Sequence, residues 1–253
     1  MIIDSKAYEW LNKNELSYNI WNKKYRHNNE TFDEWLDRVS NKNEDVKRLI
    51  LEKKFIFGGR TLANRGTNKG SYSNCYSIGY VEDSLEGIMQ SAKDIAMTFK
   101  SQGGQGLSLS KIRPKGALIK DTFESDGIVP FMEIFNTVTA SVSQGGSRKG
   151  ALMMSLDINH PEAETFMTIK SDHNKINYAN LSMEIDDDFM QKVVDGNKEV
   201  NRLFDILCTQ ACKHAEPGVL FTNRLRNYNL MEYVDSYQIE TTNPCKKEVH
   251  CTA

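Results

Sequence analysis

The sequence predicts an α/β fold, because apolar segments of strand length alternate with amphipathic helices along the chain. The segment 151–156 (ALMMSL) is almost continuously apolar, which is typical of a buried strand. Further on, Leu181, Met183 and Ile185 alternate with other side chains, which predicts a half-buried strand. A helix is predicted to begin between these strands, near Pro161, because proline suits the first turn of a helix.

The first 54 residues are rich in charge and predict helices. Thr31 and Glu34 form a capping-box pattern, and apolar residues at helical spacing follow it. A second helix is predicted from about residue 45 to 54. The glycine-rich stretch 58–70 (GGRTLANRGTNKG) is predicted to be a loop with little regular structure.

A longer helix is predicted from residue 85 to 99, where apolar residues repeat at i, i+3, i+4 and i+7. Asp83 and Glu86 form a second capping-box pattern at its start. Gly103-Gly104 is expected to end the helix, since glycine is common just beyond a helix C-terminus.

Composition excludes several classes of protein. The chain has 253 residues with 32 basic and 34 acidic side chains, and this balance argues against a nucleic-acid partner. Its apolar runs all fall short of the roughly 18 residues needed to span a bilayer, and the start (MIIDSKAYEWLNKNE) has no signal-peptide core. Five cysteines fit a reducing compartment, and the histidines show no metal-ligand spacing. We therefore expect a cytoplasmic globular protein without a membrane partner or metal site.

The cysteines fall into two groups. Cys208 and Cys212 lie on the apolar stripe of a predicted helix and are expected to be small core residues. Cys75 and Cys245 instead lie among polar and turn-forming residues, and Pro244 breaks any helix before Cys245. From these residues alone, presentation of a thiol into a cleft and burial of a structural thiol remain equal alternatives.

Glycine-rich turns occur at 58–59, 102–106 and 144–150. None matches the dinucleotide-binding fingerprint or the phosphate-binding P-loop. In the third turn, Arg148 and Lys149 lie beside glycines, so backbone and cations together can approach an anionic ligand. A surface loop with solvated basic side chains is the alternative interpretation.

Five motifs occur in one order: SYSNCYS, EDSLEGI, SQGGQGLSLSKIRPKG, SQGGSRKGA and TTNPC. Together they resemble the first portion of the catalytic subunit of ribonucleotide reductase, from about residue 15 to Cys245. The resemblance implies the first part of a ten-stranded α/β barrel, preceded by a short helical N-terminal segment. It divides the chain into a helical segment at 1–56, barrel and effector site at 57–245, and a tail at 246–253 that matches nothing in the family.

The resemblance implies roles in catalysis for several residues. Cys245 lies where the family places the cysteine that becomes a thiyl radical and removes the substrate 3′ hydrogen. Cys75 matches one of the two thiols that reduce the 2′ carbon and end as a disulfide. Asn243 matches the amide that binds the ribose hydroxyls, and Asn74 and Thr61 fall where the family contacts substrate.

The resemblance also implies regulation by a nucleotide. Asp83, Ser101 and Arg113 match the site that binds a deoxynucleotide or ATP effector, where a guanidinium is suited to a phosphate. Gln144 and Arg148 belong to the loop that relays effector identity to the choice of substrate.

The chain departs from the family beyond the radical cysteine. The family follows this cysteine with Gly-Glu, whereas here Lys246-Lys247 follows and Glu248 is one position late. The N-terminus is too short for the family's ATP-cone domain. The sequence reaches Ala253 without the second half of the barrel, which carries the partner thiol of Cys75 in the family. An intron, an intein-type insertion or a frameshift at this codon would each produce the break. The chain is thus expected to be a reductase interrupted at its radical cysteine, a catalytically inactive deoxynucleotide-binding fragment, or an inert product.

The resemblance also implies a cofactor and partners. Proline before the radical cysteine is more similar to the adenosylcobalamin-dependent enzymes than to those whose radical comes from a dimetal small subunit. The expected partners are a ribonucleotide substrate, a deoxynucleotide effector, a thioredoxin- or glutaredoxin-like reductant, the remainder of the reductase chain and a second copy in a homodimer.

Overall fold

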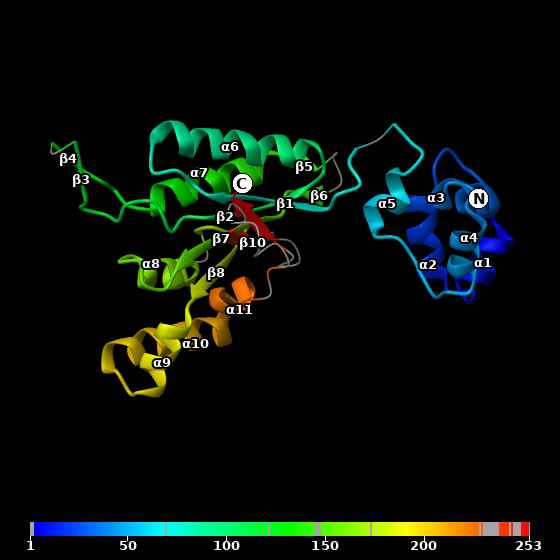
Figure 1. The fold of residues 1–253 in the computed structure, drawn as a ribbon. Coiled ribbons are helices and arrows are strands. Elements are labelled where there is room, and N and C mark those ends of the chain that lie inside the picture. Colours follow the sequence, from blue (N-terminus) through cyan, green and yellow to red (C-terminus); the bar gives the residue numbers. More distant parts are fainter. Residues whose placement is uncertain are drawn as a thin grey trace. The chain divides into compact units, whose positions relative to one another are not determined.

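The computed structural model describes residues 3–68, 70–120, 122–144, 148–172, 174–227, 229, 238–242, 244 and 249–252. Only the backbone is described at 143–144, 148–149, 238, 240 and 249–252. The chain divides into two compact units, Met1–Asn74 and Cys75–Ala253, and each is described by itself (Figure 1). Among the described residues, no helix is long and apolar enough to cross a membrane.

The first unit is helical, as the sequence predicts. Its elements are α1 (Ser5–Trp10), α2 (Glu15–Ile20), a π-helical turn (Trp21–Tyr25), α3 (Phe32–Ser40), α4 (Glu44–Leu51) and α5 (Gly59–Asn64). The capping box at the start of α3 is confirmed, with Thr31 and Glu34 each accepting from the other's backbone N–H. Aromatic side chains form the core, and the Phe32 and Trp35 rings stack 5.5 Å apart.

Helix α5 corrects the prediction of an irregular loop at residues 58–70. A buried guanidinium explains this difference. Arg38 pairs with Glu30 and also donates to the carbonyl oxygens of Leu62 (3.3 Å) and Arg65 (2.5 Å). These tertiary contacts fix the end of α5 and so override the low helix propensity of a glycine-rich segment.

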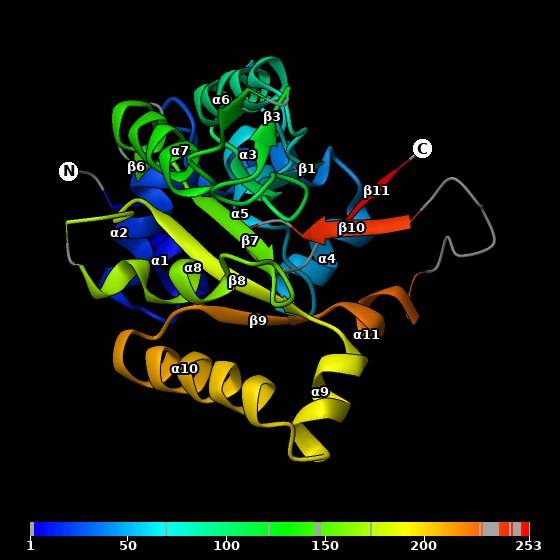
Figure 2. The same ribbon diagram turned by 90° about the vertical axis from the view of Figure 1, so that its left-hand side faces the viewer.

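The second unit contains a five-stranded parallel sheet in the order β1-β2-β7-β8-β9. The strands are β1 (Cys75–Tyr80), β2 (Gly104–Ser108), β7 (Leu152–Asp157), β8 (Ala179–Ile185) and β9 (Gly218–Phe221). The helices are α6 (Leu85–Lys100), α7 (Val129–Ser141), α8 (Ala163–Thr168), α9 (Asp187–Val194), α10 (Lys198–His214) and α11 (Thr222–Asn227), with a 3₁₀ turn at Ile169–Ser171. Together with the helical first unit, this arrangement confirms the predicted α/β class (Figure 2).

Among the described residues, the second unit also contains three antiparallel strand pairs. They pair β3 (Leu118–Ile119) with β4 (Phe123–Glu124), β5 (Ser143–Gln144) with β6 (Arg148–Lys149), and β10 (Gln238–Thr242) with β11 (Val249–Thr252).

The two faces of the sheet differ in chemistry. The helix-covered face carries Leu107, Met154 and Met183, which pack with helices α6, α7 and α8 in one apolar cluster. The opposite face, here called the inner face, carries Ser108, Ser155, Ser182 and Glu184, all nearly inaccessible to solvent. Strand β10 packs against β1 and β2 and covers this side.

The prediction that the strand at 181–185 is half-buried is therefore wrong. Both Ser182 and Glu184, the side chains between its apolar residues, are buried. Parallel sheets are commonly covered on both faces, and here β10 covers the face that the alternation assigned to solvent.

Candidate functional site

Cys75 lies at the start of β1, and its side chain is buried at the amino end of the sheet. Its Cα partner on β2 is Gly104. A Cβ at Gly104 would lie 3.2 Å from the Cys75 Sγ and 3.3 Å from the Ala151 carbonyl oxygen. Glycine on the neighbouring strand therefore provides the space that the thiol occupies.

The predicted specificity loop lies at this same end of the sheet. Strands β5 and β6 form a hairpin in which Gln144 and Arg148 are Cα partners. The chain then passes through Gly150 into β7, whose amino end is beside Gly104. A Cβ at Gly150 would lie 2.4 Å from the Phe99 ring, so glycine permits close approach to α6. The hairpin thus leads into β7, which is separated from the strand of Cys75 by β2.

The predicted effector residues Asp83 and Arg113 lie at the opposite end of the sheet. They follow β1 and β2, and the carboxyl ends of neighbouring parallel strands are a common place for ligands. The Arg113 Nε donates to Asp83 Oδ2 at 2.7 Å, and the Arg113 backbone N–H lies 3.3 Å from Oδ1. Both side chains are about one-third exposed, so the ion pair is accessible from solvent.

The predicted capping box at Asp83 is wrong, because Ser84 caps helix α6 by accepting from the Gly87 N–H. This leaves the Asp83 carboxylate to pair with Arg113. Helix α6 ends at Lys100 with Ser101 as its C-cap residue, close to the predicted end and shortly before Gly103-Gly104.

Ser101 is separated from the other two predicted effector residues. It lies at the end of a helix of 16 residues whose start follows Asp83. Since each helical residue rises 1.5 Å, Ser101 lies about 24 Å along the helix axis from that start. Within one chain the structure therefore brings Asp83 and Arg113 together, and it does not bring Ser101 to them.

The predicted substrate residues lie in the first unit. Thr61 is partly buried in α5, and Asn74 is exposed at the end of the unit. A Cβ at Gly58, just before α5, would lie 3.8 Å from the Asn74 Nδ2, so both residues are near this helix. The predicted catalytic residues Asn243 and Cys245 lie outside the described residues.

A buried carboxylate that the sequence analysis did not identify lies on the inner face. Glu184 accepts hydrogen bonds from the hydroxyls of Ser155 (2.6 Å) and Ser110 (3.2 Å). Burial raises its pKa, the serine hydrogen bonds oppose this shift, and the charge of Asp157 adds to it. The signal in the sequence was the segment NLSMEI, in which Ser182 and Glu184 alternate with the core residues.

Two exposed cysteines correct another prediction. Cys208 and Cys212 are exposed on α10, and Leu207 is the residue of this helix that is buried. The side of α10 that packs against the core carries Leu207 and the partly buried Val200 and Leu203, whereas both cysteines are exposed.

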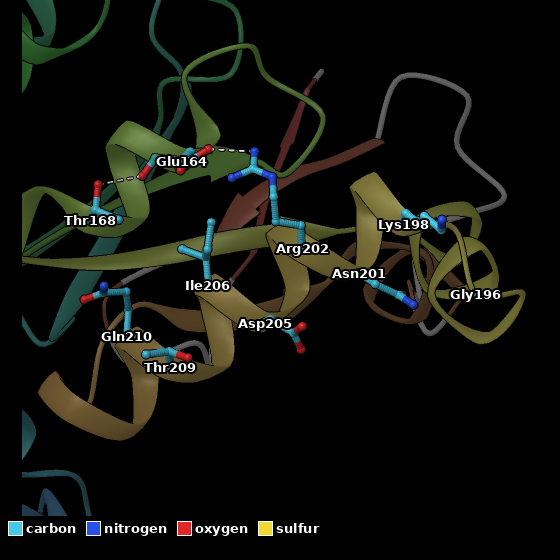
Figure 3. Close-up of a pocket in the computed structure, with 10 residues that line it drawn as sticks. All are labelled: Glu164, Thr168, Gly196, Lys198, Asn201, Arg202, Asp205, Ile206, Thr209 and Gln210. Carbon is cyan, nitrogen blue, oxygen red and sulfur yellow. Dashed lines mark hydrogen bonds and ion pairs between the residues drawn. The ribbon is translucent and has the colours of Figure 1, made fainter.

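A solvent-open hollow of about 570 Å³ lies between α8 and α10 (Figure 3). An ion pair joins its walls, with Arg202 Nη2 at 2.8 Å from Glu164 Oε2, and this hydrogen bond lowers the pKa of Glu164. The lining contains none of the predicted site residues. Among the described residues, no cluster of three or more His, Cys, Asp or Glu is placed to hold a metal ion.

Comparisons with known proteins agree with the motifs. The family model described as "Ribonucleotide reductase, barrel domain" matches residues 73–201. The vitamin B12-dependent ribonucleoside-diphosphate reductase of Thermoplasma acidophilum is 31% identical over 242 residues, covering 86% of this chain and 31% of that protein. The enzyme of the same name from Mycobacterium tuberculosis is 29% identical over 219 residues, covering 80% of this chain and 31% of that protein.

A viral relative and a solved structure extend the comparison. The ribonucleoside-diphosphate reductase large subunit of Monkeypox virus is 31% identical over 174 residues, covering 66% of this chain and 22% of that protein. The Actinobacillus ureae class Id ribonucleotide reductase alpha subunit shares the fold, with a TM-score of 0.84 at 21% identity over 98% of this chain and 47% of that one. The chain spans about a third of the length of the B12-dependent relatives. With the barrel-domain model matching more than half of its residues, this chain belongs to the ribonucleotide reductase family.

Proposed function

We propose that this chain supplies the first part of the catalytic subunit of a ribonucleoside-diphosphate reductase, which provides deoxyribonucleotides for DNA synthesis. The observation that carries the proposal is the Cys75 thiol, which is buried at the amino end of β1, next to Gly104 of β2. On its other side β2 pairs with β7, the strand that the predicted specificity loop enters. Because the chain belongs to the ribonucleotide reductase family, we assign to this thiol the reducing role of the family's matching cysteine.

The proposed reaction begins with a thiyl radical on Cys245, which takes the 3′ hydrogen of the ribose. Since S–H and ribose C–H bonds are similar in strength, this transfer is nearly reversible. Cys75 and a second thiol then supply two electrons and two protons. The 2′ hydroxyl leaves as water, a hydrogen takes its place on the carbon, and the two thiols become a disulfide. Cys245 then returns the hydrogen to the 3′ carbon, which restores the thiyl radical.

The remaining predicted site residues act on the substrate and on the thiols. Asn243 would hydrogen-bond the ribose hydroxyls, and Thr61 and Asn74 would contact the nucleotide. A thioredoxin- or glutaredoxin-like dithiol would reduce the disulfide before the next turnover. Burial of Cys75 suits this role, because it limits access of other oxidants to the thiol between turnovers.

A regulatory nucleotide would bind at Asp83 and Arg113. The Arg113 Nε is engaged by Asp83, while its Nη1 and Nη2 make long contacts of 3.4 Å with the backbone carbonyls of Leu118 and Asp83. These two nitrogens are suited to a phosphate, which a guanidinium binds through two parallel hydrogen bonds. For the bound effector to influence the choice of substrate through Gln144 and Arg148, their loop would need two arrangements. Effector and substrate would each have to bind one arrangement more tightly than the other.

Adenosylcobalamin is the cofactor that the names of the two B12-dependent relatives suggest. The described polar side chains of the inner face are hydroxyls and a carboxylate without an imidazole, so they offer no nitrogen ligand to cobalt. A radical supplied by a dimetal small subunit is the alternative source.

A second candidate function is deoxynucleotide binding without catalysis. Two observations favour it: the Asp83–Arg113 pair is complete within this chain, and Lys246-Lys247 replaces the Gly-Glu that the family places after its radical cysteine. Sequencing the mature transcript across the Cys245 codon separates the two candidates. Gly-Glu and further barrel sequence after this codon would support the reductase, and an unaltered transcript would support the binding fragment.

Calorimetric titration with dATP, dGTP and dTTP tests the nucleotide site. We expect binding that Arg113→Ala weakens at least tenfold, because a charged hydrogen-bond donor to phosphate is lost. Arg202→Ala is the matched control, since Arg202 forms a similar ion pair on α10 and should leave the affinity unchanged. Equal heats for wild type and Arg113→Ala would refute the site.

A further inference from the structure

Glu184 has no part in the proposed reaction or in effector binding, yet it is 4% exposed and lies near the carboxyl end of β8. A buried carboxylate is costly unless hydrogen bonds compensate for the loss of water. Both of its oxygens accept such bonds, from Ser155 and Ser110. Glu184 is therefore a buried carboxylate at a position where an apolar side chain would avoid the cost of desolvation.

The hydrogen bonds around Glu184 have a consistent direction. Ser155 Oγ donates to Glu184 Oε1 at 2.6 Å, so its oxygen is left to accept from the Thr241 hydroxyl 3.4 Å away. A hydroxyl has one donor and two acceptor positions, which matches this arrangement. A chain of hydrogen bonds thus runs from Thr241 on β10 through Ser155 on β7 to Glu184 on β8.

Strand β10 also lines a cavity next to Glu184. A small cavity is lined by Glu184, Leu220, Thr222, Leu225, Arg226, Ile239, Thr241 and Thr242. From α11, Arg226 Nε donates to the Ile239 carbonyl at 3.4 Å. The charged groups that face or neighbour Glu184 are therefore Arg226 and Asp157. Strand β10 meets the inner face at this cluster, where the Thr241 hydroxyl contacts Ser155 of the sheet.

The chain of hydrogen bonds survives a change in the protonation of Glu184. The Ser155 hydroxyl has a second acceptor within reach, the Leu107 carbonyl oxygen at 3.2 Å. When Glu184 carries a proton, it donates to Ser155, and Ser155 turns its own proton to Leu107. Its oxygen still has a lone pair for Thr241.

We propose that Glu184 is a positioning residue, which together with Ser155 holds β10 against the inner face of the sheet and so fixes the base of the segment that continues to Asn243 and Cys245. The significance of this segment rests on the proposed function, in which those two residues act on the ribose. The contact itself stands on the geometry of β7, β8 and β10.

Hydrogen exchange of the amides at 239–242, measured by mass spectrometry on the 253-residue chain, tests the proposal. We expect Glu184→Leu to accelerate their exchange about tenfold relative to the β7 and β9 amides, because the anchoring hydrogen bonds are lost. Glu184→Gln should restore slow exchange, since an amide both accepts and donates. Glu162→Leu is the matched control, because this carboxylate caps Lys115 and Ile128 backbone N–H groups away from β10.

Thr241→Val provides an independent variant should Glu184→Leu fail to fold. It removes one hydroxyl from β10 and should accelerate the same amides without affecting β7 or β9. Exchange within about twofold of wild type in the folded Glu184→Leu chain, or in Thr241→Val, would overturn the proposal. The measurement uses neither nucleotide nor cofactor, so its failure is distinct from failure of nucleotide binding, which would count against the proposed function.

Discussion

The two faces of the parallel sheet are formed by alternate residues of the same strands, yet different interactions stabilise them. On β8, Leu181 and Met183 enter the apolar cluster under the helices, whereas Ser182 and Glu184 lie on the inner face. Burial of apolar area on the first face stabilises the fold. The second face is also buried, but its carboxylate, Glu184, depends on hydrogen bonds from serine hydroxyls. The helix-covered face therefore stabilises the sheet, and the inner face positions strand β10.

The largest effect is expected on the helix-covered face. Met183→Ala should lower the free energy of unfolding of the second unit by about 2–5 kcal/mol, because it leaves a cavity among closely packed side chains. Ser182→Ala, one residue away on the inner face, is the control and should cost less than about 1 kcal/mol. Tryptophans 10, 21 and 35 all lie in the first unit, so hydrogen exchange of the strand amides is the appropriate measurement. Equal losses for the two variants would remove the distinction between the faces.

A smaller decrease in the free energy of unfolding is expected for a substitution on the inner face. Ser155→Ala should cost about 1–3 kcal/mol, because the buried Glu184 carboxylate loses its shortest hydrogen bond. Ser77→Ala is the matched control, since the buried Ser77 hydroxyl makes no hydrogen bond to any described residue and its removal should be nearly neutral. The same exchange measurement reports both values. A neutral Ser155→Ala would mean that Glu184 does not depend on Ser155.

The pH dependence of stability provides a third comparison. Burial raises the pKa of Glu184 above its ordinary value of 4.5, so the folded protein binds this proton more tightly than the unfolded chain. The stability that this proton contributes is complete below about pH 4.5 and is lost as pH rises through the folded pKa. Glu184→Gln cannot lose a proton, so its stability relative to wild type should increase over that range. A difference that does not change with pH would show that Glu184 titrates normally in the fold.

The smallest effect on stability is expected at the carboxyl ends of β1 and β2. Arg113→Ala breaks an ion pair that is about one-third exposed, and such pairs contribute less than about 1 kcal/mol. The same substitution should nevertheless abolish most nucleotide affinity in the titration described above. Exchange rates of the β1 and β2 amides check the first expectation. A loss of several kcal/mol would assign Arg113 a structural role.

Local sequence patterns predicted the parts of the fold that depend on local chemistry. The capping box at Thr31 and Glu34 and the strand near 151–156 follow from side-chain type and spacing alone, and both are confirmed. Helix α5 was missed because it is fixed by Arg38, a residue 24 positions before the Leu62 carbonyl that it contacts. No local pattern contains that contact.

The predicted site shows the same limit. Motif similarity identified Asp83 and Arg113, which the structure brings together, although a capping role for Asp83 was predicted wrongly because Ser84 offers the better cap. Cys208 and Cys212 were assigned to the core because their stripe is apolar, but the boundary between buried and exposed sides depends on how α10 rotates against the sheet. Glu184 was missed because burial of the second face depends on β10, more than 50 residues later in the chain.

A double-mutant cycle compares the two faces most directly. The free energy of unfolding of the second unit would be measured for Glu184→Leu, Thr241→Val and the double variant, and again with Met183→Ala in place of Glu184→Leu. We expect a coupling of about 1 kcal/mol between Glu184 and Thr241, and additivity within about 0.3 kcal/mol between Met183 and Thr241. Additivity in both cycles would contradict the claim that the inner face holds β10.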